Sequence, residues 1–483
     1  MNYRLVFRIL GRILILEAAA LLPALGVSLY YGDGTALAFV ASIGILLVVG
    51  AGPALLLPKS TNSMRPREGF VTVALSWIFL SIFGALPAFI SGVIPNYIDA
   101  VFEVISGFST TGVSVLPFIE GLPEGIIFWR SFTQWLGGMG VLILVLAILP
   151  AGERGVYNLM RAEAPGPASE RIVPRLRKTA LILYAIYMVL SVLQTVFLIC
   201  GGMGVFDSLI NMFGTAGTGG FSDRDLSIGA YNSAYFDYVV GAFMVLFSVN
   251  YGLYFAAVSR RFMQVRKNTE LKVFLGIILV STALIVVNLM TSGVFKSFGD
   301  AARHSFFQVA SLSSSTGFST ANIKLWPEFS QTLLLILMAI GACASSTGGG
   351  LKVIRVVMLF KSAMREMKKI LHPRSVNVVH INGQAVPDKT LTVVMHYFCI
   401  YVLIIILATL LLSFDSAGFD SSFAGVLSII SNAGAGFGFN SAVSNFSGFS
   451  VFSKLVLSVC MLIGRLEIFP VLILVMPSTW KRA

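Results

Sequence analysis

The sequence predicts an all-α polytopic membrane protein: two N-terminal transmembrane helices, then four units of span, pore helix and span around a central pseudo-fourfold pore. Composition predicts the membrane class, because 56% of the 483 residues are hydrophobic and 12% are charged, against about 25% charged in soluble domains. Mean hydropathy is +0.87. A loop pattern that occurs four times predicts the arrangement of the spans. An ordinary soluble enzyme is excluded.

Ten apolar stretches are long enough to cross a bilayer core of about 30 Å, which takes about twenty helical residues. They are 8–30, 35–57, 70–92, 127–149, 178–200, 236–258, 272–293, 329–361, 390–413 and 452–476. The first begins with arginines but is too long for a signal peptide, and a second span follows at once, so we expect it to remain in the chain.

Lys and Arg gather on one side of these spans. If the N-terminus is cytoplasmic, the inside segments hold 27 of the 34 Lys and Arg residues. Cytoplasmic loops carry this excess, and an even number of spans puts both termini in the cytoplasm. The net charge of +12 is then an orientation signal. We expect contact with membrane lipid and no nucleic-acid partner.

Four long outside connections each hold a half-length apolar stretch followed by a small polar cluster. The clusters are Ser109–Ser114, Gly217–Ser222, Ser315–Ser319 and Ala435–Gly438. Their anchor glycines, Gly112, Gly220, Gly317 and Gly436, lie 108, 97 and 119 residues apart. We expect a two-helix hairpin over 1–60 and repeats over 61–165, 166–262, 263–375 (with a broken second helix) and 376–483.

Such a unit suits a cation. A short helix entering from outside directs its partly negative C-terminal end to the membrane centre, and a Gly-rich loop can turn its carbonyl oxygens inward. A single loop of this kind is commonly an ordinary turn. Four of them at the same position of four repeats favour a ring of carbonyl oxygens that replaces the hydration shell of a cation. The candidate ion-binding residues are Thr110, Thr111, Gly112, Val113, Thr218, Gly219, Gly220, Phe221, Ser315, Thr316, Gly317, Phe318, Ala435, Gly436 and Phe437.

Four further motifs carry a family resemblance: Trp129–Gly140, Ala162–Pro167, Ser345–Gly350 and Gly464–Pro470. With the repeats, they resemble the Trk/Ktr/HKT superfamily of cation transporters and, within it, the TrkH/TrkG potassium-uptake subunits. The resemblance implies potassium uptake through a gated pore in a bacterial inner membrane. It also implies a homodimer, a cytosolic TrkA-like gating subunit of the nucleotide-binding RCK type, and no cofactor bound by this chain.

Filters of this family place one glycine per repeat at the selectivity position. Glycine at all four positions here favours potassium over sodium. The resemblance implies K⁺ contacts at Thr111, Gly112, Gly219, Gly220, Thr316, Gly317, Ala435 and Gly436. The fourth repeat departs most from the pattern, because Asn432–Gly438 has no hydroxyl beside its glycine.

The eighth span contains an unusual run from Gly341 to Gly350. Three successive glycines cost a helix about 1 kcal/mol each relative to alanine, so we expect this stretch to unwind or bend. A small-residue patch for close helix packing is the alternative. The resemblance implies a mobile intramembrane gate formed by Ser345, Ser346, Thr347, Gly348, Gly349 and Gly350.

Arg465 lies within the last span. An arginine on a lipid face at mid-membrane costs at least about 2.5 kcal/mol, so such residues face the interior. We expect Arg465 to line the pore and to bond the 345–350 loop in the closed state. An ion pair with Glu467 is the alternative, although residues two apart face different sides of a helix.

Other functions find less support. The sequence has no nucleophile and base pair, so we expect no enzyme activity, and no histidine pair for a metal. A Na⁺- or H⁺-coupled potassium symporter and a less selective K⁺/Na⁺ channel stay open, although a proton relay would need more mid-span acids than Glu17 and Glu467. The basic segment Lys361–Arg374 fits anionic lipid or a gating subunit equally well.

Overall fold

This computed structural model describes residues 1–57, 65–140, 176–375, 377–415, 418–434 and 446–480. The regular secondary structure of these residues is helical, apart from a short hairpin of β1 (His380–Ile381) and β2 (Gln384–Ala385). Five helices in the described ranges are long and apolar enough to cross a membrane. A sixth is added if α11 (Ala234–Phe247) and α12 (Tyr251–Val258) count as one span. The predicted all-α membrane fold is confirmed.

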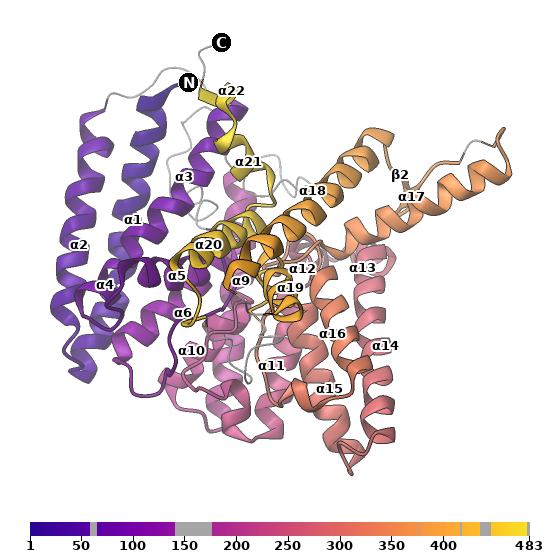
Figure 1. Ribbon diagram of the computed structural model, residues 1–483, viewed down its shortest axis with the longest axis horizontal. Coiled ribbons are helices and arrows are strands. Elements are labelled where there is room, and N and C mark those ends of the chain that lie inside the picture. The colour runs from indigo at the N-terminus through magenta and orange to yellow at the C-terminus, as the bar shows by residue number, and fades with distance from the viewer. Residues whose placement is uncertain (58–64, 141–175, 376, 416–417, 435–445, 481–483) are drawn as a thin grey trace.

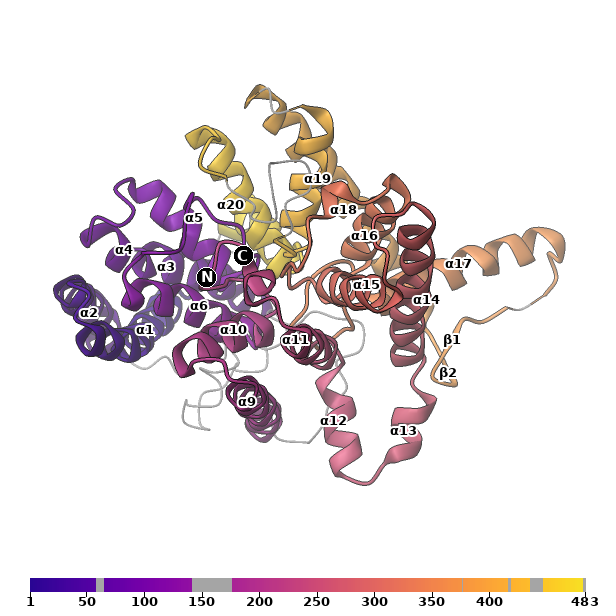
Figure 2. The same ribbon diagram turned by 90° about the horizontal axis from the view of Figure 1, so that it is seen from below.

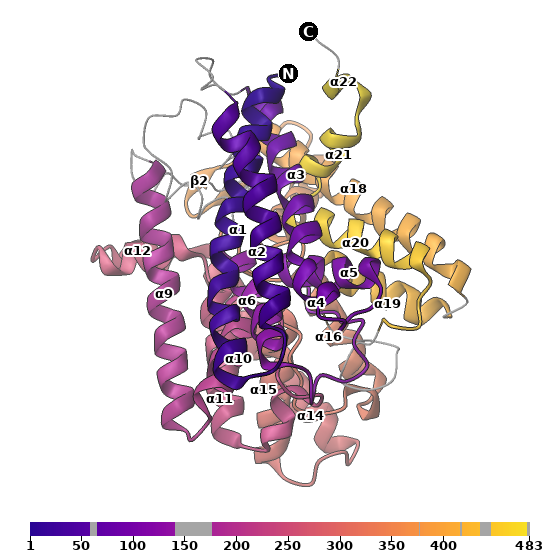
Figure 3. The same cartoon turned by 90° about the vertical axis from the view of Figure 1, so that its left-hand side faces the viewer.

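The N-terminal hairpin consists of α1 (Tyr3–Tyr31) and α2 (Ala36–Ala51), which run side by side (Figure 3) into a π-helical turn at Gly52–Leu56. The two helices meet at Gly11 and Gly50. A methyl group on Gly11 would lie 2.5 Å from the carbonyl oxygen of Gly50, and one on Gly50 would lie 2.8 Å from that of Gly11. Small residues at a crossing permit such close packing in a membrane.

The rest of the chain follows one order of elements four times: a long helix, a short helix, a turn and a second helix. The long helices are α3 (Pro66–Gly84, continued by α4, Leu86–Ile90), α9 (Leu176–Cys200), α14 (Thr269–Thr291) and α18 (Asp388–Leu412). The short ones are α5 (Tyr97–Phe108), α10 (Val205–Ala216), α15 (Phe298–Ser313) and α19 (Phe419–Ile430). The second helices are α6 (Glu124–Gly138), α11, α16 (Glu328–Ile340) and α20 (Val451–Arg465).

Seen from below, these four groups follow one another around a common centre (Figure 2). The remaining elements are α13 (Phe262–Lys267), α17 (Val353–Leu371), α21 (Phe469–Val475), α22 (Pro477–Trp480) and 3-10 turns at Ser227–Tyr231, Ile323–Leu325 and Ser413–Asp415. Of these, α17 projects away from the body of the molecule (Figure 1).

Three predicted spans are not continuous helices. The predicted span 236–258 is bent, because α11 and α12 meet at 90°. The predicted span 329–361 breaks between Ile340 and Val353, as its glycines indicate. The predicted span 452–476 breaks after Arg465, and Glu467 and Ile468 adopt φ of 54° and 70°. In the span predicted at 127–149, α6 ends at Gly138 and residues from 141 on lie outside the described ranges.

The bend between α11 and α12 is stable because a distant loop satisfies the backbone that it frees. The Cys343 N–H donates to the carbonyl of Ser248 at 3.2 Å, and the Thr347 hydroxyl donates to that of Phe247 at 3.1 Å. The Asn250 side chain caps α12 by accepting the Gly252 N–H at 2.8 Å. Backbone inside a membrane must find such partners in the protein, and these lie about a hundred residues away, beyond any local pattern.

The start of α1 and the helix α22 lie at the same end of the molecule (Figure 3). The rings of Tyr3 and Trp480 stack with centroids 6.5 Å apart. The turn between α1 and α2 lies at the other end, where the Gly125 N–H donates to Asp33 at 2.7 Å.

We expect Arg4→Cys and Ser478→Cys, in a background without the native cysteines, to react with a membrane-impermeant maleimide from one side of sealed vesicles. Both positions are exposed and at the end that holds Tyr3 and Trp480. Tyr30→Cys, exposed at the opposite end, should react only from the other side. Labelling of positions 4 and 478 from opposite sides would contradict the fold.

Candidate functional site

All four short helices end in the same backbone turn. The first residue of each turn has left-handed dihedrals: Thr110, Thr218, Ser315 and Asn432 have φ of 57°, 55°, 61° and 49°. Two residues later comes a glycine with positive φ: Gly112, Gly220, Gly317 and Gly434, at 81°, 75°, 85° and 60°. A non-glycine residue in this region costs about 1–2 kcal/mol, so the fourfold recurrence indicates a constrained geometry.

The residue between them folds back onto its helix in every case. The N–H groups of Thr111, Gly219, Thr316 and Ala433 donate to the carbonyls of Ser106, Gly214, Ser311 and Ser428 at 2.9, 2.9, 2.8 and 2.9 Å. Each turn therefore begins at the C-terminal end of a helix, where the partial charge is negative. Four such ends gather around one centre.

The turns contact one another as a closed ring. A methyl group on Gly112 would lie 1.6 Å from the carbonyl oxygen of Gly219, in the next repeat. The other three junctions repeat this contact at 2.2 Å: Gly220 with the oxygen of Thr316, Gly317 with that of Ala433, and Gly434 with that of Thr111. The chain thus brings its four turns together in the order of the repeats, and only glycine fits at each junction.

In the fourth repeat the ring position belongs to Gly434, two residues before the Gly436 chosen from the sequence. The predicted Ala435, Gly436 and Phe437 lie outside the described residues. Gly434, Gly436 and Gly438 alternate along the chain, and nothing local distinguishes them. The end of α19 at Ile430 and the positive φ of Asn432 fix the alignment.

Asn432 supplies a polar group where the fourth repeat has no hydroxyl beside its glycine. Its Nδ2 donates to Thr111 Oγ1 at 2.8 Å and to the carbonyl of Met461 at 3.1 Å. The amide therefore ties the fourth turn to the first and closes the ring. This role was not predicted, although Asn is one of the few residues that readily adopt positive φ.

In the first three repeats, the residue after the ring glycine is buried. Val113, Phe221 and Phe318 are each at most 1% exposed. The carbonyls of Val113 and Phe318 accept hydroxyl bonds from Ser106 and Ser311, both at 2.6 Å. The side chains of these residues therefore anchor the turns in the protein.

The segment between α16 and α17 is unwound and packs against the ring. It runs from Gly341 to Lys352 and includes the predicted 345–350 loop. A methyl group on Gly348 would lie 2.7 Å from the carbonyl oxygen of Ser314, and one on Gly349 2.1 Å from that of Ser431. The loop therefore touches the C-terminal ends of two short helices. The predicted unwinding is confirmed.

Arg465 joins three repeats. Its guanidinium donates to the carbonyl of Thr347 at 3.0 Å, to the hydroxyl of Thr110 at 3.3 Å and to the carbonyl of Gly138 at 2.6 Å, and it also bonds Gly137. The expected contact with the 345–350 loop is present. The alternative pairing partner, Glu467, forms an ion pair with Arg355 instead.

Buried charges that the sequence did not single out hold this loop. Glu270 accepts the Ala344 N–H at 2.7 Å, and the Lys352 ammonium donates to the carbonyl of Gly348. The sequence offered one signal: Glu270 lies at the margin of a predicted span and Lys352 lies inside another, and a charge in such a position needs a protein partner.

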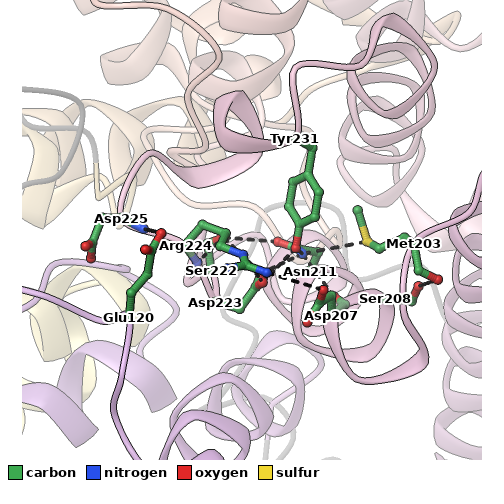
Figure 4. A network of polar contacts seen from close by, with 10 residues as sticks. All are labelled: Glu120, Met203, Asp207, Ser208, Asn211, Ser222, Asp223, Arg224, Asp225 and Tyr231. Carbon is green, nitrogen blue, oxygen red and sulfur yellow. Dashed lines mark hydrogen bonds and ion pairs between the residues drawn. The ribbon is translucent and has the colours of Figure 1, made fainter.

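In the second repeat, a polar network follows the turn (Figure 4). Asp223 accepts bonds from Asn211 at 2.9 Å and from the hydroxyl of Tyr231 at 2.7 Å. Burial, and then the charge of Asp223, raise the pKa of Tyr231, so its hydroxyl stays a neutral donor. Among the described residues, no group of three or more His, Cys, Asp or Glu is placed to hold a metal.

Comparison with known proteins identifies the family and agrees with the overall fold. A family model described as a cation transport protein, TrkH, matches residues 36–481. The chain belongs to the TrkH family of cation transport proteins. It is 37% identical to the Trk system potassium uptake protein TrkH of Escherichia coli K12 over all of both chains, and 32% identical to TrkG of the same organism over 99% of each. The crystal structure of the potassium transporter TrkH from Vibrio parahaemolyticus matches over all of both chains with a TM-score of 0.90 and 33% identity.

We expect Gly434→Ala to lower the melting temperature of the purified protein by several degrees. An alanine there must hold positive φ, at a cost of about 1–2 kcal/mol, and its methyl would meet the oxygen of Thr111. Gly425→Ala in the same repeat is the control, because open space surrounds the new methyl and alanine favours a helix. Equal melting temperatures for the two variants would contradict the assignment of Gly434 to the ring.

Proposed function

We propose that this chain takes up potassium across the bacterial inner membrane through a pore whose selectivity filter is the ring of four turns. The filter consists of Thr110–Val113, Thr218–Phe221, Ser315–Phe318 and, in the fourth repeat, Asn432–Gly434. K⁺ contacts Thr111, Gly112, Gly219, Gly220, Thr316 and Gly317, with Ala433 and Gly434 in place of Ala435 and Gly436. The repeats follow the boundaries expected from the sequence.

One observation carries this proposal: each glycine of the ring lies against a backbone carbonyl of the next repeat. A ring of carbonyl oxygens replaces the hydration shell of a potassium ion, and the converging helix ends add negative potential. The names of the relatives, Trk system potassium uptake proteins, support the choice of ion. Inward movement is driven by the membrane potential, at about 2.3 kcal/mol per charge for every 100 mV.

The gate in this proposal is the 345–350 loop together with Arg465. The guanidinium carries its positive charge to Thr347 and to the filter residue Thr110, where it opposes the passage of a cation. Opening requires the loop to leave the arginine. The fixed bonds of Arg465 to Gly137 and Gly138 hold the guanidinium in place while the loop moves.

The proposal includes two assembly partners. A second copy of the chain forms a homodimer, and a cytosolic TrkA-like subunit of the RCK type controls the gate. The relatives are named Trk system potassium uptake proteins, and the word system supports a protein with partners. Both termini lie in the cytoplasm, in agreement with the excess of Lys and Arg at that end.

We expect proteoliposomes that hold this chain to take up ⁸⁶Rb⁺, and K⁺ to compete with the tracer far better than Na⁺ does. Gly112→Ser should abolish this preference, because its side chain would collide with the oxygen of Gly219. Equal competition by K⁺ and Na⁺ in the unsubstituted protein would contradict a potassium filter. The tracer assay on empty liposomes is the control.

Arg465→Ala should raise tracer uptake severalfold, because it removes both the positive charge and the bond that holds Thr347. Arg465→Lys, which keeps the charge but not the forked geometry, should give an intermediate rate. Uptake that is unchanged or lower in Arg465→Ala, at equal protein in the membrane, would contradict the gate.

A further inference from the structure

Gln134 lies on α6 of the first repeat, but its amide serves the turn of the second. The side chain is fully buried. Its Oε1 accepts the Phe221 N–H at 3.0 Å, and a methyl group on Gly219 would lie 2.4 Å from its Cδ. The amide therefore fills the space directly behind the second turn.

The other end of the amide reaches the first turn. Because the Phe221 N–H is a donor, it fixes the carbonyl oxygen of the Gln134 amide on that side and turns Nε2 the other way. Nε2 lies 3.6 Å from the place of a methyl group on Gly112, and it has no hydrogen-bond partner among the described residues. One planar side chain thus spans the junction between the first and second turns.

Arg130 lies one helical turn before Gln134 on α6. It contacts Phe221 from the other side. Its guanidinium lies over the Phe221 ring, 3.4 Å from the centroid, and Nε donates to Glu103 at 2.5 Å. Glu103 also accepts the Ser114 hydroxyl and the Val115 N–H, both at 2.9 Å. A buried ion pair such as that of Arg130 and Glu103 is costly to break, so it makes a rigid support.

The segment of residues 221–225 is also bound to the first repeat at its far end, at Asp225. The Ile119 N–H donates to Asp225 at 2.7 Å, and Figure 4 shows Glu120 beside Asp225, whose N–H it accepts at 3.4 Å. Residues 221–225 are therefore held by the first repeat at both ends, with Gln134 at the end nearest the ring.

In the fourth repeat, the position that corresponds to Gln134 carries no amide. A methyl group on Gly137 would press on the carbonyl of Phe108, the last residue of α5, and one on Gly464 on that of Ile430, the last residue of α19. Gln134 lies three residues before Gly137, and Met461 lies three residues before Gly464, so the two occupy equivalent positions. Met461 offers its own backbone carbonyl, to Asn432, and its side chain has no N–H to donate.

We infer that Gln134 is a positioning residue that sets the preference for K⁺ over Na⁺, by fixing the spacing between the first and second turns of the ring. This inference rests on the proposed function. Ion choice by a carbonyl ring depends on how its oxygens are held around the ion. Loss of the amide frees the Phe221 N–H and lets the oxygen of Gly219 move towards a smaller ion.

The test replaces Gln134 with methionine, a side chain of equal length that lacks the amide. Methionine is also the residue at the equivalent position of the fourth repeat, Met461. In proteoliposomes, Gln134→Met should reduce the ratio of Na⁺ to K⁺ concentrations that half-block ⁸⁶Rb⁺ uptake by about fivefold, the scale of one neutral hydrogen bond. Gln194→Met is the matched control. Gln194 is equally buried and donates to Thr215 at 2.8 Å, so its loss tests buried amides in general and should leave the ratio unchanged.

If the unsubstituted protein prefers K⁺ and folded Gln134→Met shows the same ratio of half-blocking Na⁺ to K⁺ concentrations, this inference alone is overturned. No preference in the unsubstituted protein overturns the proposed function as well. If Gln134→Met does not elute as a single species, Gln134→Asn, which keeps the amide but withdraws it by one methylene, takes its place and should lower the ratio. If neither variant folds, Gln134 serves the fold and the inference is wrong.

Discussion

The need to satisfy every backbone group inside the membrane governs the design of this protein. Each of the four turns leaves regular helix, and each returns its N–H groups to the helix that it has just left, as Thr111 does to Ser106. Where a second helix breaks, another repeat supplies the partners, as Cys343 does for Ser248. Non-helical backbone survives at membrane depth only when protein surrounds it in this way. The pore-like centre is thus a consequence of how the turns are supported.

Several charged side chains inside the molecule follow the same constraint. Glu103 is paired with Arg130 next to the first turn, and Glu467 is paired with Arg355 below the ring. Glu270 accepts the N–H of Ala344 in the loop and that of Ile354 at the start of α17. Each charge is thereby tied to irregular backbone, which means that the least regular parts of the fold are also those held by the strongest local interactions.

The sequence was sufficient for the class of fold, the four recurring turns and the unwound stretch at 341–352, because composition, repetition and consecutive glycines are local signals. It was insufficient for the alignment of the fourth turn, where Gly434 and Gly436 are alternatives that only the end of α19 separates. It also missed the bend at 248–250 and the amide of Gln134. In both cases the hydrogen-bond partner lies far away in the chain, so no pattern within one segment could predict it.

The ring is made by one polypeptide, so its four quarters are encoded separately. In an assembly of four identical subunits, one altered codon changes every quarter at once. Here a single substitution changes one quarter and leaves the other three intact, which allows evolution or engineering to adjust the opening in small steps. The unlike residues at the ring, with Asn432 where the first two repeats have threonine, are the form that such stepwise divergence takes.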